Sequence, residues 1–192
     1  MWSWPFLDIR HGLRVIAVIK EIVVVTGPEC CGKTTLAKQL ADRLEAPLVN
    51  EAARDYLQNK DSYQKSDLLK IAKLQNAMEQ EKAVLSADKL VCDTDLLVIL
   101  IWSEGKYGRC DPWIREAFEN CFNEKSLTRH YILCAPNIPW QKDRLRENPH
   151  NRDELFDMYK KKLTDYKLDY SVVSGGPQER LRQTLDRFKY KQ

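Results

Sequence analysis

Short apolar runs recur along most of the chain, separated by longer stretches in which polar and apolar residues alternate with helical spacing. The runs are four to six residues long and largely β-branched or aromatic, as is typical of strands buried on both faces of a parallel sheet. We expect five strands, at residues 21–26, 47–50, 89–93, 130–134 and 170–173. Strands that alternate with helices along the sequence predict an α/β fold, with a five-stranded parallel sheet sandwiched by helices.

The segments between these runs carry the periodicity and the start signals of helices. Asp111 before Pro112 resembles an N-cap followed by proline at the first helical position. Asn151 with Glu154 resembles a capping box. We expect helices over residues 36–44, 66–87, 155–166 and 177–190, and another that begins at Pro112.

The turn between the first strand and the first helix carries the strongest chemical signal. Its sequence, G-P-E-C-C-G-K-T-T, fits the P-loop pattern G-x-x-x-x-G-K-[ST]. Glycines let the backbone wrap closely around a phosphate chain, and the N–H groups at the helix start face the anion. We expect ATP and Mg²⁺ here, with Lys33 on the β- and γ-phosphates and the Thr34 hydroxyl on the metal ion. The predicted ATP-binding residues of this turn are Gly27, Pro28, Glu29, Cys30, Cys31, Gly32, Lys33, Thr34 and Thr35.

Acidic residues follow two of the predicted strands, at the edge of the sheet where ligands of α/β proteins gather. Asp93 ends the third strand and is a candidate for the Mg²⁺ shell or for accepting a proton from an attacking hydroxyl. Asp95 is a candidate for the other of these roles or for substrate binding; alternatively, one of the two acids caps the helix that begins at Leu96. Glu51 and Arg54, which share a helical face after the second strand, would bind substrate or form a solvent-exposed pair.

A basic segment and two aromatic residues complete the candidate site. Arg144, Arg146 and Arg152 lie within nine residues after the fourth strand, where they would form a lid that brings cations over the transferring phosphoryl group. Arg146 is the candidate catalytic arginine, and Arg144 and Arg152 would bind ATP; a solvated run of charges is the alternative. Trp102 and Tyr107 would stack on a planar ring of the substrate, unless they belong to the core.

Composition limits the class of protein. The 192 residues are 43% hydrophobic and 31% charged, as in a soluble globular protein. We expect a single domain over residues 21–192, preceded by an N-terminal extension over residues 1–20. A net charge of +3 argues against a dedicated nucleic-acid-binding protein, and the longest apolar run is too short to span a bilayer. Six scattered cysteines without a C-x-x-C pair indicate reduced thiols in a cytoplasm.

Taken together, these segments resemble the ribosylnicotinamide kinase domain of the bacterial NadR-type regulators of NAD biosynthesis, a group of P-loop kinases often labelled AAA-like ATPases. The resemblance implies a P-loop kinase fold that transfers the γ-phosphate of ATP to the 5′-hydroxyl of nicotinamide riboside, yielding nicotinamide mononucleotide. The matching segments run in family order over about residues 21–189: G-P-E-C-C-G-K-T-T-L-A at 27–37, N-E-A-A-R-D-Y at 50–56, C-D-T-D-L-L at 92–97, W-S-E-G-K-Y-G at 102–108, P-W with D-R-L-R at 139–146, and H-N-R-D at 150–153.

The chain also departs from the family pattern. Cys30 and Cys31 stand where the family usually has serines, and Arg144 replaces a glycine, which would alter the flexibility of the lid. The DNA-binding and adenylyltransferase domains of the larger regulators do not fit in the 20 residues before the first strand, so neither activity is predicted. Two alternatives remain open: a kinase of another small nucleoside, nucleotide or metabolite, and a non-enzymatic nucleotide-binding switch.

Overall fold

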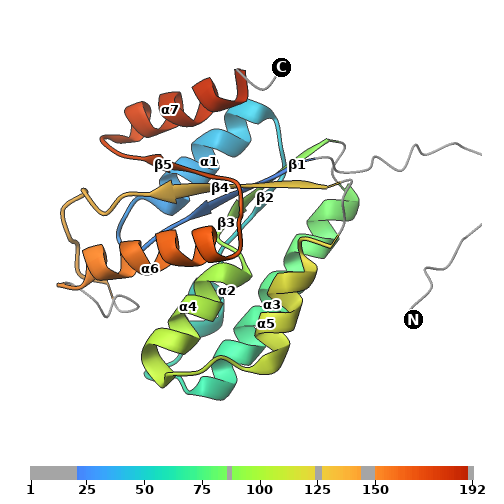
Figure 1. Cartoon of the computed structure of the whole chain (residues 1–192), viewed down its shortest axis with the longest axis vertical. Coiled ribbons are helices and arrows are strands. Elements are labelled where there is room, and N and C mark those ends of the chain that lie inside the picture. The colour runs from blue at the N-terminus through green and yellow to red at the C-terminus, as the bar shows by residue number, and fades with distance from the viewer. Residues whose placement is uncertain (1–20, 86–87, 124–126, 144–149, 190–192) are drawn as a thin grey trace, which may run out of the picture.

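Five parallel strands form the centre of the molecule (Figure 1). The computed structural model describes residues 21–85, 88–123, 127–143 and 150–189. The sheet has the order β2-β3-β1-β4-β5, and every neighbouring pair is parallel. Because β1 is the central strand, the turn that follows it lies at the middle of the carboxyl edge. The strands are β1 (Glu21–Thr26), β2 (Leu48–Val49), β3 (Lys89–Asp93), β4 (Thr128–Cys134) and β5 (Tyr170–Val173).

Helices cover both faces of the sheet, as Figure 1 shows. One face packs on α1 and α7, through a buried cluster that includes Val23, Val25 and Leu40. The other face packs on α2 to α6, through a larger cluster that includes Ile22 and Leu97. The helices are α1 (Lys33–Leu44), α2 (Ala52–Leu57), α3 (Lys65–Leu85), α4 (Leu96–Tyr107), α5 (Pro112–Asn120), α6 (Arg152–Asp165) and α7 (Pro177–Lys189).

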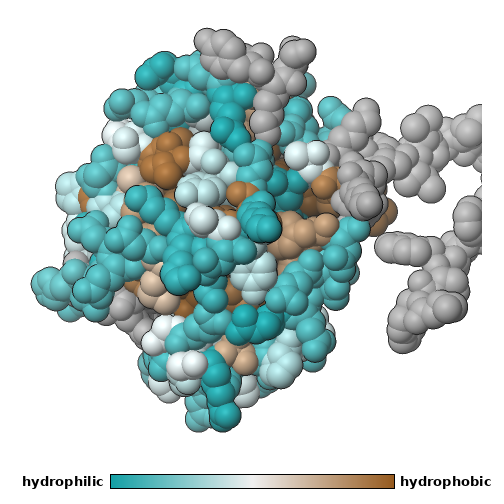
Figure 2. All heavy atoms as spheres, viewed as in Figure 1, coloured by the Kyte–Doolittle hydropathy of each residue, from teal (hydrophilic) through white to brown (hydrophobic). Residues whose placement is uncertain are grey.

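The apolar residues predicted to be strands are buried between these two helical layers. All of β1 except Glu21 is buried, and so are the central residues of β3 and β4. Hydrophilic residues predominate on the face drawn in Figure 2, with apolar patches only between them. Among the helices of the described residues, none has both the length and the apolar content that crossing a bilayer requires.

Most element boundaries agree with the sequence, and the exceptions have local causes. β2 is shorter than expected because only Leu48 and Val49 pair with β3, and α1 begins three residues early, directly after Gly32. The predicted capping box is wrong: Asn151 is the N-cap of α6, but its side chain makes no capping hydrogen bond. Its backbone has φ −110° and ψ 19°, outside the extended region in which N-cap side chains reach the first turn.

The expected N-terminal extension, residues 1–20, lies outside the described residues, as do Arg144 and Arg146.

The register of the sheet determines which strand ends lie next to the P-loop. Val25 of β1 is opposite Asp93 of β3, and Thr26 is opposite Leu133 of β4. The end of β3 therefore lies beside the start of the P-loop.

Candidate functional site

The P-loop joins β1 to α1 over residues 27–32, and two of its glycines are required by its shape. Gly27 has φ 136° and Gly32 has φ 80°, conformations that residues with a Cβ rarely adopt. A Cβ added to Gly27 would lie 2.8 Å from the carbonyl oxygen of Cys134. The loop therefore lies directly against the end of β4, and only glycine fits at this contact.

A cavity of about 240 Å³ opens between the P-loop and three helices, α2, α4 and α6. These helices cover the face of the sheet that carries the larger buried cluster. One part of its wall is polar and comes from the loop and from α1. The other part is largely apolar and comes from α2, α4 and α6. The lining residues are Gly27, Pro28, Glu29, Cys30, Gly32, Lys33, Thr34, Thr35, Glu51, Ala53, Arg54, Leu57, Val98, Ile101, Trp102, Leu155 and Tyr159.

Lys33 lies at the polar end of the cavity. Its Nζ atom donates a hydrogen bond to the carbonyl oxygen of Pro28 at 2.7 Å. Burial by itself would lower the pKa of Lys33, but negative charge on Cys31, Glu51 and Asp93 outweighs it and raises the pKa. The ammonium group is therefore charged at neutral pH and faces the cavity in which we expect phosphates.

Asp93 lies next to Thr34 and close to Lys33. Asp93 is only 2% exposed, and burial raises its pKa although a hydrogen bond from Thr34 and the charge of Lys33 act in the opposite direction. Within the described residues, its Oδ1 atom has no hydrogen-bond partner. A buried carboxylate oxygen without a partner, next to a hydroxyl, suits a hard cation such as Mg²⁺, which takes few protein ligands and completes its shell with phosphate and water. In the described part of the chain, no cluster of three or more His, Cys, Asp or Glu side chains forms a fuller metal site.

Glu51 and Arg54 reach the cavity from the start of α2. Burial raises the pKa of Glu51; the charge of Lys33 lowers it, and the charge of Asp93 raises it further. Arg54 lies 4.0 Å from Glu51 and 3.3 Å from Asp143, measured between nitrogen and oxygen atoms. The structure thus brings together Lys33, Thr34, Glu51, Arg54 and Asp93, as expected from their positions at strand ends.

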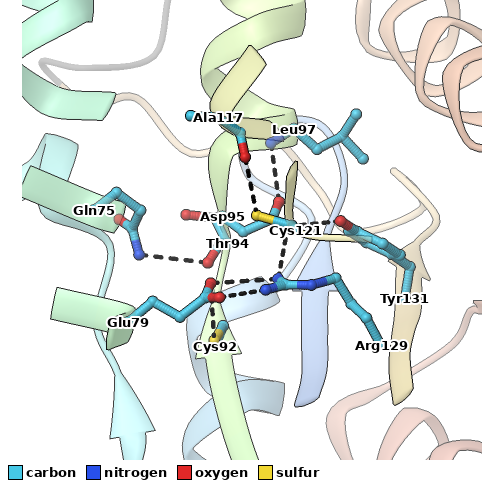
Figure 3. A network of polar contacts seen from close by, with 10 residues as sticks. All are labelled: Gln75, Glu79, Cys92, Thr94, Asp95, Leu97, Ala117, Cys121, Arg129 and Tyr131. Carbon is cyan, nitrogen blue, oxygen red and sulfur yellow. Dashed lines mark hydrogen bonds and ion pairs between the residues drawn. The ribbon is translucent and has the colours of Figure 1, made fainter. Parts of the chain in front are cut away.

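Asp95 does not line this cavity. It is 1% exposed, and its Oδ1 atom accepts a hydrogen bond from the backbone of Leu97 at 3.0 Å, so it is the N-cap of α4. Its Oδ2 atom accepts from Arg129 at 3.1 Å and from Tyr131 at 2.7 Å. Figure 3 shows this buried network, in which Arg129 also pairs with Glu79 of α3. The capping alternative is confirmed for Asp95, and a catalytic or substrate-binding role stays a prediction that its burial does not favour.

The remaining predicted residues are divided between the cavity and its surroundings. Trp102 lines the cavity, and its indole N–H donates to the hydroxyl of Tyr63 at 2.8 Å. Tyr107 packs against the core and is not among the lining residues. Arg152 donates to the carbonyl oxygens of Cys30 and Ile138 at 3.2 and 2.8 Å, so it joins the P-loop to the segment after β4.

Of the two P-loop cysteines, only Cys30 lines the cavity, and Cys31 points into the core. Burial would raise the pKa of the Cys31 thiol, but a hydrogen bond with Cys134 and the charges of Lys33 and Arg180 lower it to about 7. The loop therefore has a thiol on its inner side where the resembling family usually has a hydroxyl.

Two functional candidates were missed from the sequence. Arg180 is 1% exposed and its guanidinium donates to the carbonyl oxygens of Cys31 and Ala135, each at 2.9 Å. Gln75 is buried in α3, and its side-chain amide forms hydrogen bonds with the backbone of two turns at the site. It accepts one from Ala52 and donates to Asn50 and Thr94. A signal was available for Gln75, a polar residue on the apolar face of its helix, four and three residues after Ile71 and Ala72. Arg180 does not share a helical face with Leu181 and Leu185, so the pattern around it gave no such signal.

A family model described as an AAA domain matches residues 22–180, most of the chain. The chain belongs to this family. The match begins in β1 and ends at Arg180, so it spans the P-loop, the carboxylates at the ends of β2 and β3, and α6.

Solved structures agree with the family and confirm the predicted fold. The structure titled NadR protein in complex with NAD and AMP-PNP is 20% identical in sequence, has a TM-score of 0.69, and covers 90% of this chain and 49% of its own. NadR in complex with NR gives a TM-score of 0.65 at the same identity. Thymidylate kinase from Ehrlichia chaffeensis is 11% identical with a TM-score of 0.61, covering 90% of this chain and 98% of its own.

These similarities establish the fold of a NadR-type P-loop domain, as the resemblance in sequence implied. This chain spans about half the length of the NadR structures that it matches. No curated protein matches the chain in sequence.

Proposed function

We propose that this protein transfers the γ-phosphoryl group of ATP to a hydroxyl of a nucleoside, and that the acceptor is nicotinamide riboside. One observation carries the proposal: Lys33 and Glu51 line one end of a cavity, next to the buried Asp93, and the other end of the cavity is apolar and partly aromatic. Such a cavity offers a phosphate site and a ring site within one chamber. The similarity of the fold to NadR in complex with NR supports the choice of acceptor.

The polar end suits the phosphate donor. Backbone N–H groups of the P-loop and the charged Nζ atom of Lys33 would hold the β- and γ-phosphates. Mg²⁺, when bound, would neutralise charge on these phosphates, and Thr34 and Asp93 are the residues that would hold it. Arg180 donates a hydrogen bond to the carbonyl oxygen of Cys31 and so holds the inner side of the loop in place.

The apolar end suits a flat ring. Trp102 and Tyr159 line it together with Leu57, Val98 and Ile101. The nicotinamide ring of the riboside carries a positive charge, and aromatic faces attract such a charge. Glu51 and Arg54, between the two ends, would bind the hydroxyls of the ribose.

In the reaction, the 5′-hydroxyl oxygen of the acceptor attacks the γ-phosphorus, and the bond from phosphorus to the oxygen bridging the β- and γ-phosphates breaks. ADP leaves with that bonding pair. Glu51 would take the hydroxyl proton, since it lines the cavity and its raised pKa makes it a better base than an ordinary glutamate. Lys33 would stabilise the negative charge on the moving phosphoryl group.

The proposal is tested by incubating the full chain with Mg·ATP and separate acceptors: nicotinamide riboside, deoxyadenosine, thymidine and dTMP. ADP and phosphorylated product are measured by mass spectrometry. We expect nicotinamide mononucleotide with a specificity constant at least about a hundredfold above the other acceptors. Phosphorylation of another acceptor alone would overturn the substrate assignment, and ATP binding without transfer to any acceptor would overturn the kinase assignment in favour of a nucleotide-binding switch.

A further inference from the structure

Gln75 joins two turns that come from different parts of the chain. Its side chain is 2% exposed in the middle of α3. The Oε1 atom accepts a hydrogen bond from the backbone of Ala52 at 2.8 Å. The Nε2 atom donates to the carbonyl oxygens of Asn50 and Thr94, at 3.3 and 3.5 Å; Figure 3 shows the second of these contacts.

Each of these turns presents one carboxylate of the site. Glu51 lies between the two residues of the first turn that Gln75 binds. Asp93 directly precedes Thr94 in the second turn. One side-chain amide thus contacts the neighbours of both carboxylates while contacting neither of them.

The second turn has a backbone that needs support. Thr94 has φ 71°, a left-handed conformation that β-branched residues adopt with difficulty. Its N–H donates to the carbonyl oxygen of Val25 at 3.0 Å, and its carbonyl oxygen accepts from Gln75. The residue is therefore held on one side by β1 and on the other by α3.

A second contact of α3 holds the far side of the same turn. Glu79, one helical turn after Gln75, pairs with Arg129, which in turn pairs with Asp95 at 3.1 Å (Figure 3). These side chains are almost fully buried, so the pairs are weakly screened. Helix α3 is thus linked to the middle of the Asp93–Asp95 segment through Gln75, and to its end through Glu79 and Arg129.

The carboxylates of Glu51 and Asp93 repel each other, because both carry negative charge and both lie near Lys33. We propose that Gln75 is a positioning residue that fixes the spacing between Glu51 and Asp93, and thereby the spacing between the proton acceptor and the metal site. The inference rests on the proposed function for the roles of these two acids. It goes beyond that function by assigning the spacing to a helix that contributes no residue to the cavity wall.

The test uses Gln75→Met, which keeps the length of the side chain and removes all of its hydrogen bonds. ATP affinity is measured in EDTA and in Mg²⁺, and phosphoryl transfer is measured at saturating ATP. We expect ATP affinity in EDTA to stay within about twofold of the wild type, because the P-loop is untouched. The gain in affinity on adding Mg²⁺ and the kcat should each fall about ten- to a hundredfold, the usual effect of losing a group that orients a metal ligand.

Two matched controls separate positioning from general destabilisation. Gln80→Met makes the same change at an exposed position of α3, and Ile71→Val reduces the packing of the same helix in the core. Both should lower kcat by less than about twofold, even where Ile71→Val lowers the melting temperature. If Ile71→Val at an equal loss of melting temperature lowers kcat as much as Gln75→Met does, the positioning role is overturned.

A double-mutant cycle with Asp93→Asn decides whether Gln75 acts through Asp93. We expect Gln75→Met to cause no further loss of the Mg²⁺-dependent gain in ATP affinity once Asp93 is changed, since groups that act as a unit are not additive. Additive losses would overturn the inference. This cycle needs no acceptor, so the absence of transfer by the wild type would refute the proposed function and leave the cycle to decide on Gln75. If Gln75→Met does not fold, Gln75→Glu, which keeps the acceptor for Ala52 and loses both donors, takes its place with the same expectations.

Discussion

Arg180 donates a hydrogen bond to the carbonyl oxygen of Cys31 at 2.9 Å, although the two residues are 149 positions apart in sequence. The same guanidinium also donates to the carbonyl oxygens of Ala135 and Gly175. One buried side chain of α7 therefore supports the P-loop, the end of β4 and the turn after β5. The shape of the loop depends on a helix at the other end of the chain.

We predict that Arg180→Met weakens ATP binding as well as the fold. Three carbonyl oxygens lose their donor in a buried site, which should lower the free energy of unfolding by about 3 kcal/mol. The KM for ATP should rise about tenfold, because the loop loses support on its inner side. Chemical denaturation and steady-state kinetics measure the two effects. Arg182→Met, on the exposed side of α7, is the matched control and should change neither quantity; an unchanged KM in Arg180→Met would contradict the prediction.

Lys33→Met should abolish phosphoryl transfer and leave the fold intact. The ammonium group is the cation that faces the expected phosphates, and losing such a group typically costs about a hundred- to a thousandfold in kcat. Within the described residues, its Nζ atom donates a hydrogen bond to Pro28 of the same loop, so the melting temperature should change little. Steady-state kinetics and a thermal melt check both statements. Transfer within a few-fold of the wild type would show that Lys33 is not the phosphate ligand.

Asp93→Asn should lower kcat by about a hundredfold or more, because it removes a residue that would hold the Mg²⁺ ion whose charge stabilises the transferring phosphoryl group. Its effect on ATP binding in EDTA should be much smaller. It should also move the acid limb of the pH profile. The charge of Asp93 raises the pKa of Glu51, so its removal should lower that pKa and shift the acid limb of the residual activity to lower pH. The pH dependence of kcat/KM measures this shift. A shift in the opposite direction would mean that Glu51 is not the group that titrates.

Asp95→Asn should act mainly on stability. The change keeps an oxygen that can accept from Leu97, but it removes the charge opposite Arg129 in a buried pair. Breaking such a pair should lower the free energy of unfolding by about 3 kcal/mol, and kcat should fall far less than in Asp93→Asn. Denaturation and kinetics on both variants make the comparison. A stable Asp95→Asn protein without activity would instead give Asp95 the catalytic role.

Glu104 should make stability depend on pH in the acid range. Burial would raise the pKa of Glu104, but hydrogen bonds from Lys162 and Arg115 outweigh it and lower the pKa below its usual value of 4.5. A carboxylate with a lowered pKa in the folded state stabilises the fold above its unfolded-state pKa, and this contribution is lost as the pH falls through the folded-state value. Glu104→Gln should therefore be less stable than the wild type at neutral pH, and the difference should shrink as the pH falls below 4.5, the usual pKa of a glutamate. A difference that is constant with pH would contradict this account.

Local sequence patterns were sufficient to predict the class of the fold and the position of the P-loop. Apolar runs of strand length and leucines at helical spacing are local patterns, so they predict elements without any knowledge of tertiary contacts. The P-loop is also local: Gly27, Gly32 and Lys33 lie within seven residues, and the glycines are needed for the backbone conformation of that one turn. Asp93 could be assigned to the candidate site because it ends a predicted strand, where ligands of α/β proteins gather.

Tertiary structure decided which polar residues serve the site and which serve the core. Asp93 and Asp95 are two residues apart, but the left-handed Thr94 between them sends the second toward Arg129 and Tyr131 rather than toward the cavity. Gln75 and Arg180 contact the turns of the site across 19 to 25 and up to 149 positions of sequence. Such contacts depend on the packing of whole helices against the sheet, and the sequence near either partner does not show which distant turn a polar helical residue will contact.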